Sequence, residues 1–270
     1  MIVNSDKYIK FSIIIPTYNR GYCISDAINS VIEQSYKEFE LIVVDDASQD
    51  NTLEVLRNFS VYDIKVIKNY RNQGCNASKN NGAFAAKGDY LIFLDSDDRL
   101  FNSTTLKQIS HELRINGFPK IAMFSSVNFQ NVKVHQEFDT GFVTYKDYLR
   151  EKRHGEFLPL VNRLIFLNYN FPTEIVGGEG ITWRFICKEF KSMYFSCTPS
   201  RLYNDISSDR LSYRSKSNSL RIMKVYIFQL RYLFWDYLVL YQMGLLRIAL
   251  GLVYNFLHYL RFSIVDFFKR

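Results

Sequence analysis

The sequence predicts an α/β protein with a doubly wound, mostly parallel sheet. From residue 11 to residue 126, short apolar runs alternate with segments that have helical character. An almost uninterrupted apolar run is typical of a strand buried on both faces, and strict alternation with helices gives a parallel sheet covered on both sides. Polar and mainly acidic residues follow the first, second and fourth runs. Functional side chains are therefore expected at one edge of the sheet, where the strands end.

The mainly apolar runs are the expected strands. Each contains four to six residues, a length that suits a strand better than a helix. The strands are expected at residues 11–15, 39–44, 64–67, 90–94 and 121–124.

Helices are expected between these strands. Apolar residues at positions 24, 27, 28, 31 and 32 recur at the spacing of one helix face. Asn51 and Thr52 are residue types that cap a helix N-terminus, so a short helix with apolar residues up to Phe59 is expected to follow them. The other helices are expected at the Ala-rich residues 77–86, at 106–115 and at 181–190.

Composition limits the class of protein. The chain has 270 residues, which fits one large domain or a domain with an appendage. Its 23 Phe and 19 Tyr exclude an intrinsically disordered chain. The net charge of +7 favours a polyanionic partner: nucleic acid, a phosphate-bearing substrate or an anionic membrane. The four cysteines form no Cys-x-x-Cys pair, so neither a zinc site nor a disulfide framework is expected, and a cytoplasmic location is favoured.

The character of the chain changes twice along its length. We expect a catalytic domain at residues 1–215, with a regular half at about 10–125 and a less regular half at about 126–215, and a helical segment at 216–270. Residues 237–260 are nearly long enough to span a bilayer, but Gln242, Arg247, Asn255 and His258 interrupt them. A basic, aromatic helix on the membrane surface is favoured, and a buried helical hairpin and a spanning helix are the alternatives.

The acidic turn after the fourth strand suggests a metal site. Asp95 and Asp97 are one residue apart, so both carboxylates can converge on one hard cation such as Mg²⁺ or Mn²⁺. A solvated acidic turn is the alternative, and the matching pair Asp45 and Asp46 after the second strand weakens it. The chain has neither a Walker A loop nor the glycine fingerprint of dinucleotide binding.

Several motifs together resemble the family 2 glycosyltransferases, which have the GT-A fold. They lie in the expected order and spacing, cover residues 10–125 well and are weaker over 126–215. The matching segments are 14–20 (IIPTYNR), 43–52 (VVDDASQDNT), 72–74 (NQG), 77–82 (ASKNNG), 88–90 (GDY) and 93–98 (FLDSDD).

This resemblance implies a nucleotide-diphospho-sugar donor, a divalent metal (Mn²⁺ or Mg²⁺) and inversion at the anomeric carbon. Asp97 would be the main metal ligand, with Asp95 beside it and near the ribose, and Asp46 would accept a hydrogen bond from the base. Lys79 stands where the family often has Arg and would lie near the diphosphate. The residues that the resemblance assigns to the nucleotide sugar are Pro16, Thr17, Tyr18, Arg20, Asp46, Lys79, Asp95, Ser96 and Asp97.

The second half supplies a candidate general base. The family usually has an acidic pair a few residues before an aromatic residue, and here only Glu179 precedes Trp183. Glu179 is the predicted base, with a carboxylate at a helix N-terminus as the alternative. Trp183 is either a stacking surface for the acceptor sugar or part of the core, and Asp98 is a second candidate for acceptor binding. Arg210 or Arg214, in a polar stretch, is a candidate for contact with the diphosphate.

The resemblance and the C-terminal composition lead to one functional prediction. The protein would move a sugar, with a UDP-sugar favoured as donor, to a saccharide acceptor linked to polyprenyl diphosphate. This reaction would take place at the inner face of the cytoplasmic membrane, in the synthesis of bacterial O antigen, capsule or exopolysaccharide. Alternatives are an inactive GT-A-like protein and a nucleotidyltransferase, although the latter would have a glycine-rich basic loop after the first strand. A nucleic-acid binder is disfavoured because acids at the strand ends would repel phosphates.

Overall fold

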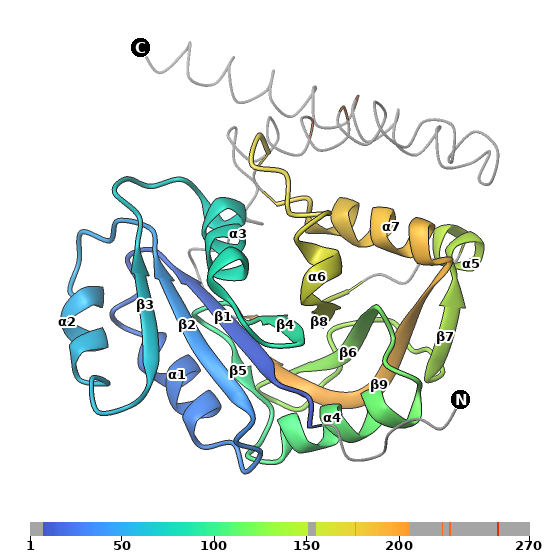
Figure 1. Ribbon diagram of the computed structural model, residues 1–270, viewed down its shortest axis with the longest axis horizontal. Helices are drawn as coiled ribbons and strands as arrows, with labels where there is room; N and C mark the ends of the chain where they lie inside the picture. The colour runs from blue at the N-terminus through green and yellow to red at the C-terminus, as the bar shows by residue number, and fades with distance from the viewer. Residues whose placement is uncertain are drawn as a thin grey trace.

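Helices cover both faces of a mixed β-sheet in the described part of the chain (Figure 1). The structure is a computed structural model that describes residues 8–150, 155–175 and 177–205, together with the single residues Met223, Ile227 and Val253. The expected α/β architecture is confirmed. The predicted segment 216–270 and the candidates Arg210 and Arg214 lie outside the described residues.

The elements follow the expected order, with one short additional strand in the first half and further additions in the second half. The strands are β1 (Phe11–Thr17), β2 (Phe39–Asp45), β3 (Ile64–Lys68), β4 (Tyr90–Phe93), β5 (Arg99–Leu100), β6 (Ile121–Asn128), β7 (Gly141–Thr144), β8 (Phe157–Asn162) and β9 (Ser192–Tyr203). The helices are α1 (Ile24–Ile32), α2 (Thr52–Arg57), α3 (Cys75–Ala85), α4 (Thr105–Ile115), α5 (Tyr145–Arg150), α6 (Arg163–Phe166) and α7 (Glu179–Phe190).

The strand order explains where the site lies. The order is β3-β2-β1-β4-β8-β6-β9-β5, with β7 paired to β9. β1 is parallel to both β2 and β4, so the chain moves outward from β1 to β3 and then returns to the other side of β1. A crevice opens at such a switch point, at the carboxyl ends of the two neighbouring strands. These ends carry the motifs that follow β1 and β4.

β8 makes the sheet mixed. It runs antiparallel to β4 on one side and to β6 on the other, while β6 and β9 are parallel. Pro159 lies in the middle of β8 and lacks a backbone N–H, which is unfavourable inside a sheet. β8 accommodates it because the pairing with β4 ends at Leu160, one residue before Pro159 is reached.

Two apolar layers fill the spaces on either side of the sheet. Ile13 and Ile15 of β1 face α1, α2 and α4, and Ile14 faces α3, α6 and α7, as the alternation of a strand requires. α3 lies very close to the sheet at Gly82, where an added Cβ would be 2.5 Å from Ile14 Cγ2. This close packing fixes α3, which carries Lys79 into the cleft.

The start of α2 differs from the prediction in its details. The helix begins at Thr52 and ends at Arg57, and its N-cap Asn51 makes no side-chain capping bond. Asp50 supplies the acceptor instead, since its carboxylate accepts a hydrogen bond from the Thr52 backbone N–H at 3.0 Å. Among the described residues, no helix combines the length and the apolar character needed to cross a bilayer.

Candidate active site

A cleft of about 950 Å³ lies at the carboxyl ends of β1 and β4. Its far wall comes from β6, β8, β9 and α7. All twelve candidate site residues that lie in the described part of the chain line this cleft: Pro16, Thr17, Tyr18, Arg20, Asp46, Lys79, Asp95, Ser96, Asp97, Asp98, Glu179 and Trp183. The residues from the two halves of the chain therefore share one cavity.

The loop after β1 is held by the loop after β2. Asn19 has a left-handed backbone with φ 53°, a conformation that asparagine tolerates. Its N–H donates to Ser48 Oγ at 2.9 Å, and its side-chain oxygen accepts from the Gln49 N–H at 2.8 Å. Beside this loop, Thr17 Oγ1 is buried and has no hydrogen-bond partner among the described residues. A ligand with a polar edge would satisfy it.

Asp46 organises the loop that leads into α3. Its carboxylate accepts hydrogen bonds from the backbone N–H groups of Gln73 at 2.9 Å and Gly74 at 2.7 Å, and from Asn69 Nδ2 at 2.8 Å. Gly74 has φ 91°, which favours glycine. A carboxylate has about four acceptor positions, so one is left for the expected bond from a base. That bond stays a prediction.

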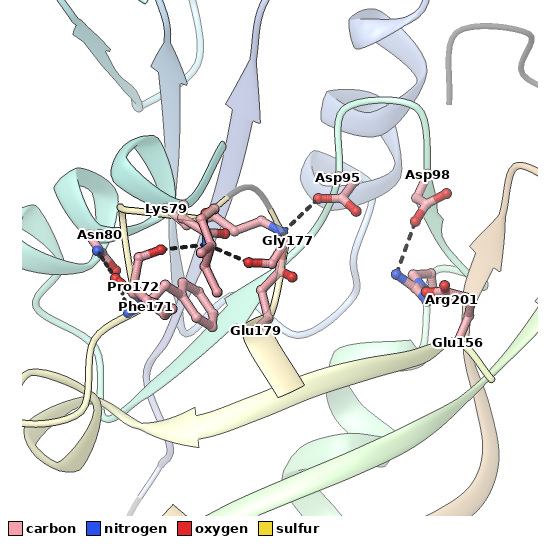
Figure 2. A network of polar contacts seen from close by, with 12 residues as sticks. Lys79, Asn80, Asp95, Asp98, Glu156, Phe171, Pro172, Gly177, Glu179 and Arg201 are labelled. Carbon is pink, nitrogen blue, oxygen red and sulfur yellow. Dashed lines mark hydrogen bonds and ion pairs between the residues drawn. The ribbon is translucent and has the colours of Figure 1, made fainter. Parts of the chain in front are cut away.

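Lys79 connects the two halves of the cleft. Its Nζ lies 3.0 Å from Asp95 Oδ1 on the turn after β4 and 3.3 Å from Glu179 Oε1 at the start of α7 (Figure 2). Burial disfavours the ammonium, but the negative charges of Asp95 and Glu179 outweigh this effect and raise the pKa of Lys79 well above its usual value. Loss of hydration likewise disfavours ionised Asp95, but Lys79 lowers the pKa of this carboxyl below its usual value. Lys79 and Asp95 are therefore both charged at neutral pH.

Glu179 is the first residue of α7, which is the position that the alternative interpretation, a carboxylate at a helix N-terminus, describes. Gly177 and Gly178 precede it with φ 76° and 85°, a left-handed pair that favours glycine at both positions. The Glu179 carboxylate contacts Lys79 across the cleft, and α7 has no side-chain capping bond at its N-terminus. Glu179 therefore faces the donor half of the chain.

The turn after β4 offers oxygen ligands of the kind that a hard cation prefers. It closes with a hydrogen bond from the Asp98 N–H to the Asp95 carbonyl at 3.0 Å. No cluster of three or more metal-binding side chains occurs in the part of the chain that the structure describes. A pair of carboxylates nevertheless fits Mg²⁺ or Mn²⁺, because such ions are often held by one or two carboxylates and complete their shell with substrate phosphates. Asp95 and Asp97 fit a cation that arrives with a nucleotide.

A buried arginine supports the same turn from behind. Arg201 Nη1 lies 3.1 Å from Asp98 Oδ2, and Arg201 Nη2 lies 3.2 Å from Glu156 Oε2 (Figure 2). Asp98 Oδ1 also accepts from the Asn204 N–H at 2.9 Å. Burial raises the pKa of Asp98 to about 7, although Arg201 opposes this shift. Because both oxygens of Asp98 have contacts within the protein, its contact with an acceptor stays a prediction.

Sequence analysis did not identify Arg201 or Glu156 as site residues. Arg201 lies near the end of the long strand β9, and its partners Asp98 and Glu156 are distant in sequence, so no local pattern marks it as a site residue. Trp183 belongs in part to both of its expected environments. It is only 7% exposed and packs against Phe93, Phe166 and Phe171, yet it also lines the cleft.

The family model for glycosyl transferase family 2 matches residues 12–162. The chain belongs to glycosyltransferase family 2. It is 31% identical, over 81% of its length and 72% of the relative, to the GalNAc(5)-diNAcBac-PP-undecaprenol beta-1,3-glucosyltransferase of Campylobacter jejuni. It is also 32% identical, over 62% of its length and 65% of the relative, to the Escherichia coli enzyme WfgD, a UDP-Glc:alpha-D-GlcNAc-diphosphoundecaprenol beta-1,3-glucosyltransferase. The predicted family and enzyme class are confirmed.

Solved structures agree at the level of the fold. Staphylococcus aureus TarS 1–349 in complex with UDP-GlcNAc superposes with a TM-score of 0.67 at 21% identity, over 82% of this chain and 67% of TarS 1–349. The mannosyltransferase PcManGT of Pyrobaculum calidifontis, in complex with GDP-Man and Mn²⁺, gives a TM-score of 0.59 at 18% identity, over 84% of this chain and 66% of that enzyme. The glycosyltransferase described here therefore has the GT-A fold.

Proposed function

We propose that this glycosyltransferase transfers a sugar from a UDP-sugar, with inversion, to a saccharide linked to undecaprenyl diphosphate. Both curated relatives named above carry beta-1,3-glucosyltransferase and an undecaprenyl-diphosphate acceptor in their names, and one name specifies UDP-Glc. UDP-glucose is therefore the first donor to test. The product would enter a bacterial surface polysaccharide such as O antigen, capsule or exopolysaccharide.

One observation carries this proposal: Lys79 is paired with both Asp95 and Glu179. These ion pairs, at 3.0 and 3.3 Å, join the turn expected to hold the donor diphosphate to the carboxylate expected to activate the acceptor. Inverting transfer needs these two groups around one anomeric carbon. The cleft of about 950 Å³ has room for a nucleotide sugar and part of an acceptor between them.

Asp97, with Asp95, would hold Mn²⁺ or Mg²⁺. A divalent cation there would neutralise the charge that develops on the departing diphosphate. Thr17 Oγ1 and the remaining acceptor position of Asp46 would bind the base, with Pro16 and Tyr18 beside it. Arg20 and Ser96 complete the donor side.

Glu179 would act as the general base. It takes the proton of the acceptor hydroxyl as that oxygen bonds to the anomeric carbon. The bond between that carbon and the diphosphate oxygen breaks, and its electron pair leaves with UDP. Attack and departure occur on opposite faces, so the configuration inverts. Through its two ion pairs, Lys79 would hold the carboxylates of Glu179 and Asp95 at a fixed separation.

The reaction would take place at the inner face of the cytoplasmic membrane. The acceptor is lipid-linked in both relatives, and the net charge of +7 suits an anionic membrane surface. We propose that residues 216–270 supply the peripheral attachment.

The test replaces Glu179 with glutamine and measures transfer from UDP-glucose to GlcNAc-diphosphoundecaprenol in the presence of Mn²⁺. Loss of a general base lowers kcat by about 10²- to 10⁴-fold, while the affinity for UDP should stay within about threefold of the wild type. Glu189→Gln is the matched control, because Glu189 is an exposed acid on the same helix and does not line the cleft. An unchanged kcat for Glu179→Gln, or a collapse of UDP affinity, would overturn the assignment of the base.

A further inference from the structure

One face of α3 is polar and buried. Asn76, Lys79 and Asn80 are spaced i, i+3 and i+4, which places them together on the helix surface. They are only 4%, 6% and 6% exposed. Lys79 contacts Glu179 itself, and the two asparagines contact the connection between α6 and α7 (residues 167–178, of which residue 176 is not described). We refer to this connection as the α6–α7 loop.

Asn80 pairs with the backbone of the α6–α7 loop in both directions. Its Nδ2 donates to the Phe171 carbonyl at 2.9 Å, and its Oδ1 accepts from the Phe171 N–H at 3.0 Å. Such a pair satisfies the donor and the acceptor of one buried peptide residue and fixes its orientation. The beginning of the loop is thus attached to α3.

Asn76 binds the second part of the same loop. Its Nδ2 donates to the carbonyls of Pro172 at 2.8 Å and Gly177 at 3.0 Å, with a longer contact to Ile175 at 3.3 Å. Its Oδ1 is buried and has no hydrogen-bond partner among the described residues. A buried, unpartnered oxygen is unfavourable, so Asn76 stabilises the loop only through the hydrogen bonds that its Nδ2 donates.

We infer that Asn76 and Asn80 are positioning residues for Glu179. This inference rests on the proposed role of Glu179 as the base. Gly177 and Gly178, directly before Glu179, restrain the backbone little, because glycine has a wide choice of conformation. The two amides supply that restraint from α3, the helix that also carries Lys79. The base is thereby set at a fixed distance from the donor side of the cleft.

The next residue of α3 provides a contrasting variant. Asn81 Nδ2 donates to Asn69 Oδ1 at 2.9 Å, and Asn69 in turn donates to Asp46. Asn80 and Asn81 are therefore neighbours in sequence that support opposite sides of the cleft: the base and the donor loop. Their substitutions should separate kcat from donor binding.

The experiment measures kcat, and the Kd for UDP, in Asn76→Ala and Asn80→Ala, each alone and combined with Glu179→Gln. The substrates are UDP-glucose and GlcNAc-diphosphoundecaprenol with Mn²⁺. A displacement of about 1 Å can cost about 10²-fold in rate, so each single variant should lose about 10- to 100-fold in kcat with UDP affinity within threefold. Each double variant should be no slower than Glu179→Gln alone. Asn81→Ala should weaken UDP binding instead, and the exposed Asn58→Ala should change neither quantity.

A kcat within twofold of the wild type in both single variants would overturn the inference. So would additive losses in the double variants, because residues that act through Glu179 have no further effect once it is gone. Asn76→Ser, which keeps one hydroxyl donor, replaces Asn76→Ala if that variant does not fold, and it should lose less kcat. An unaffected kcat in Glu179→Gln would reject the proposed base, which is a separate and recognisable result.

Backbone hydrogen exchange gives a readout that does not depend on turnover. Exchange across the α6–α7 loop should accelerate in Asn76→Ala and Asn80→Ala and stay at the wild-type rate in Asn81→Ala. Unchanged exchange in the first two variants would contradict the inference whatever the kinetics.

Discussion

Replacing Lys79 with methionine removes one positive charge from the cleft and keeps most of the side-chain volume. Two ion pairs, at 3.0 and 3.3 Å, are lost. Removing one partner of a fully buried pair costs about 3–5 kcal/mol, because the other charge stays buried alone. Here the Asp95 and Glu179 side chains remain 42% and 30% exposed, so water replaces part of the interaction. We expect the free energy of unfolding to fall by only about 1–2 kcal/mol after this discount for screening.

The effect on the donor should be larger than the effect on stability. A hydrogen bond to a charged group contributes about 1.5–3 kcal/mol, which corresponds to about 10- to 150-fold in affinity. Lys79→Met should weaken UDP binding by this factor. Lys79→Arg keeps the charge, and arginine is common at this position in the family motif, so its UDP affinity should stay within about tenfold of the wild type.

Calorimetric titration with UDP in the presence of Mn²⁺ measures the affinity, and urea unfolding measures the stability. If Lys79→Met binds UDP and turns over within threefold of the wild type, then Lys79 has no role on the donor side. If Lys79→Arg and Lys79→Met are equally impaired, the charge is not the property that matters.

Three further predictions concern stability and are measured by urea unfolding. Gly82→Ala should lose about 1–3 kcal/mol, because the new Cβ would be 2.5 Å from Ile14 Cγ2; an unchanged midpoint would contradict the close packing of α3. Burial opposes ionisation of Glu40, but its hydrogen bonds lower its pKa below 4.5, so Glu40→Gln should cost about 1 kcal/mol at pH 7. This difference should shrink as the pH falls through the lowered folded-state pKa, because the carboxylate is then protonated in the folded protein as well; a difference that does not shrink on acidification would refute it. Arg201→Met should cost about 1–3 kcal/mol at pH 7 by leaving buried Asp98 without its partner, which is less than for a fully ionised pair because Asp98 has a pKa of about 7 and can take up a proton. Adding Asp98→Asn should recover most of that loss; no recovery would exclude this electrostatic origin.

The parallel half of the fold could be predicted because its central strands β1, β2 and β4 are apolar and largely buried on both faces. β1 at Phe11–Thr17 extends the predicted run only by Pro16 and Thr17, and α3 and α4 begin within two residues of their predicted starts. β8 could not be predicted, since Pro159 argues against a central strand unless the register with β4 is known. β5 and β7 have only two and four residues and form through pairing with β9, a contact that is distant in sequence.

The residues of the candidate site also include some that could be predicted from the sequence and some that could not. Residues directly after β1, β2 and β4 could be predicted, because parallel strands bring their ends to one edge. Glu179 could be predicted from its acidic character among glycines before an aromatic residue. Asn76 could not be assigned a role, because its partners are backbone carbonyls about 100 positions away. The i, i+3, i+4 spacing of Asn76, Lys79 and Asn80 could have pointed to this role. Three polar residues on one buried helix face need polar partners elsewhere in the chain.

In the proposed reaction, the turn from Asp95 to Asp97 binds a nucleoside diphosphate together with a divalent cation. The most direct measurement is calorimetric titration of the wild type and of Asp97→Ala with UDP, with and without Mn²⁺, using Asp63→Ala as an exposed control. We expect UDP binding that requires Mn²⁺ in the wild type and in Asp63→Ala, and loss of that metal dependence in Asp97→Ala. The same Mn²⁺-dependent affinity in Asp97→Ala, or no binding of UDP by the wild type with Mn²⁺ present, would contradict this expectation.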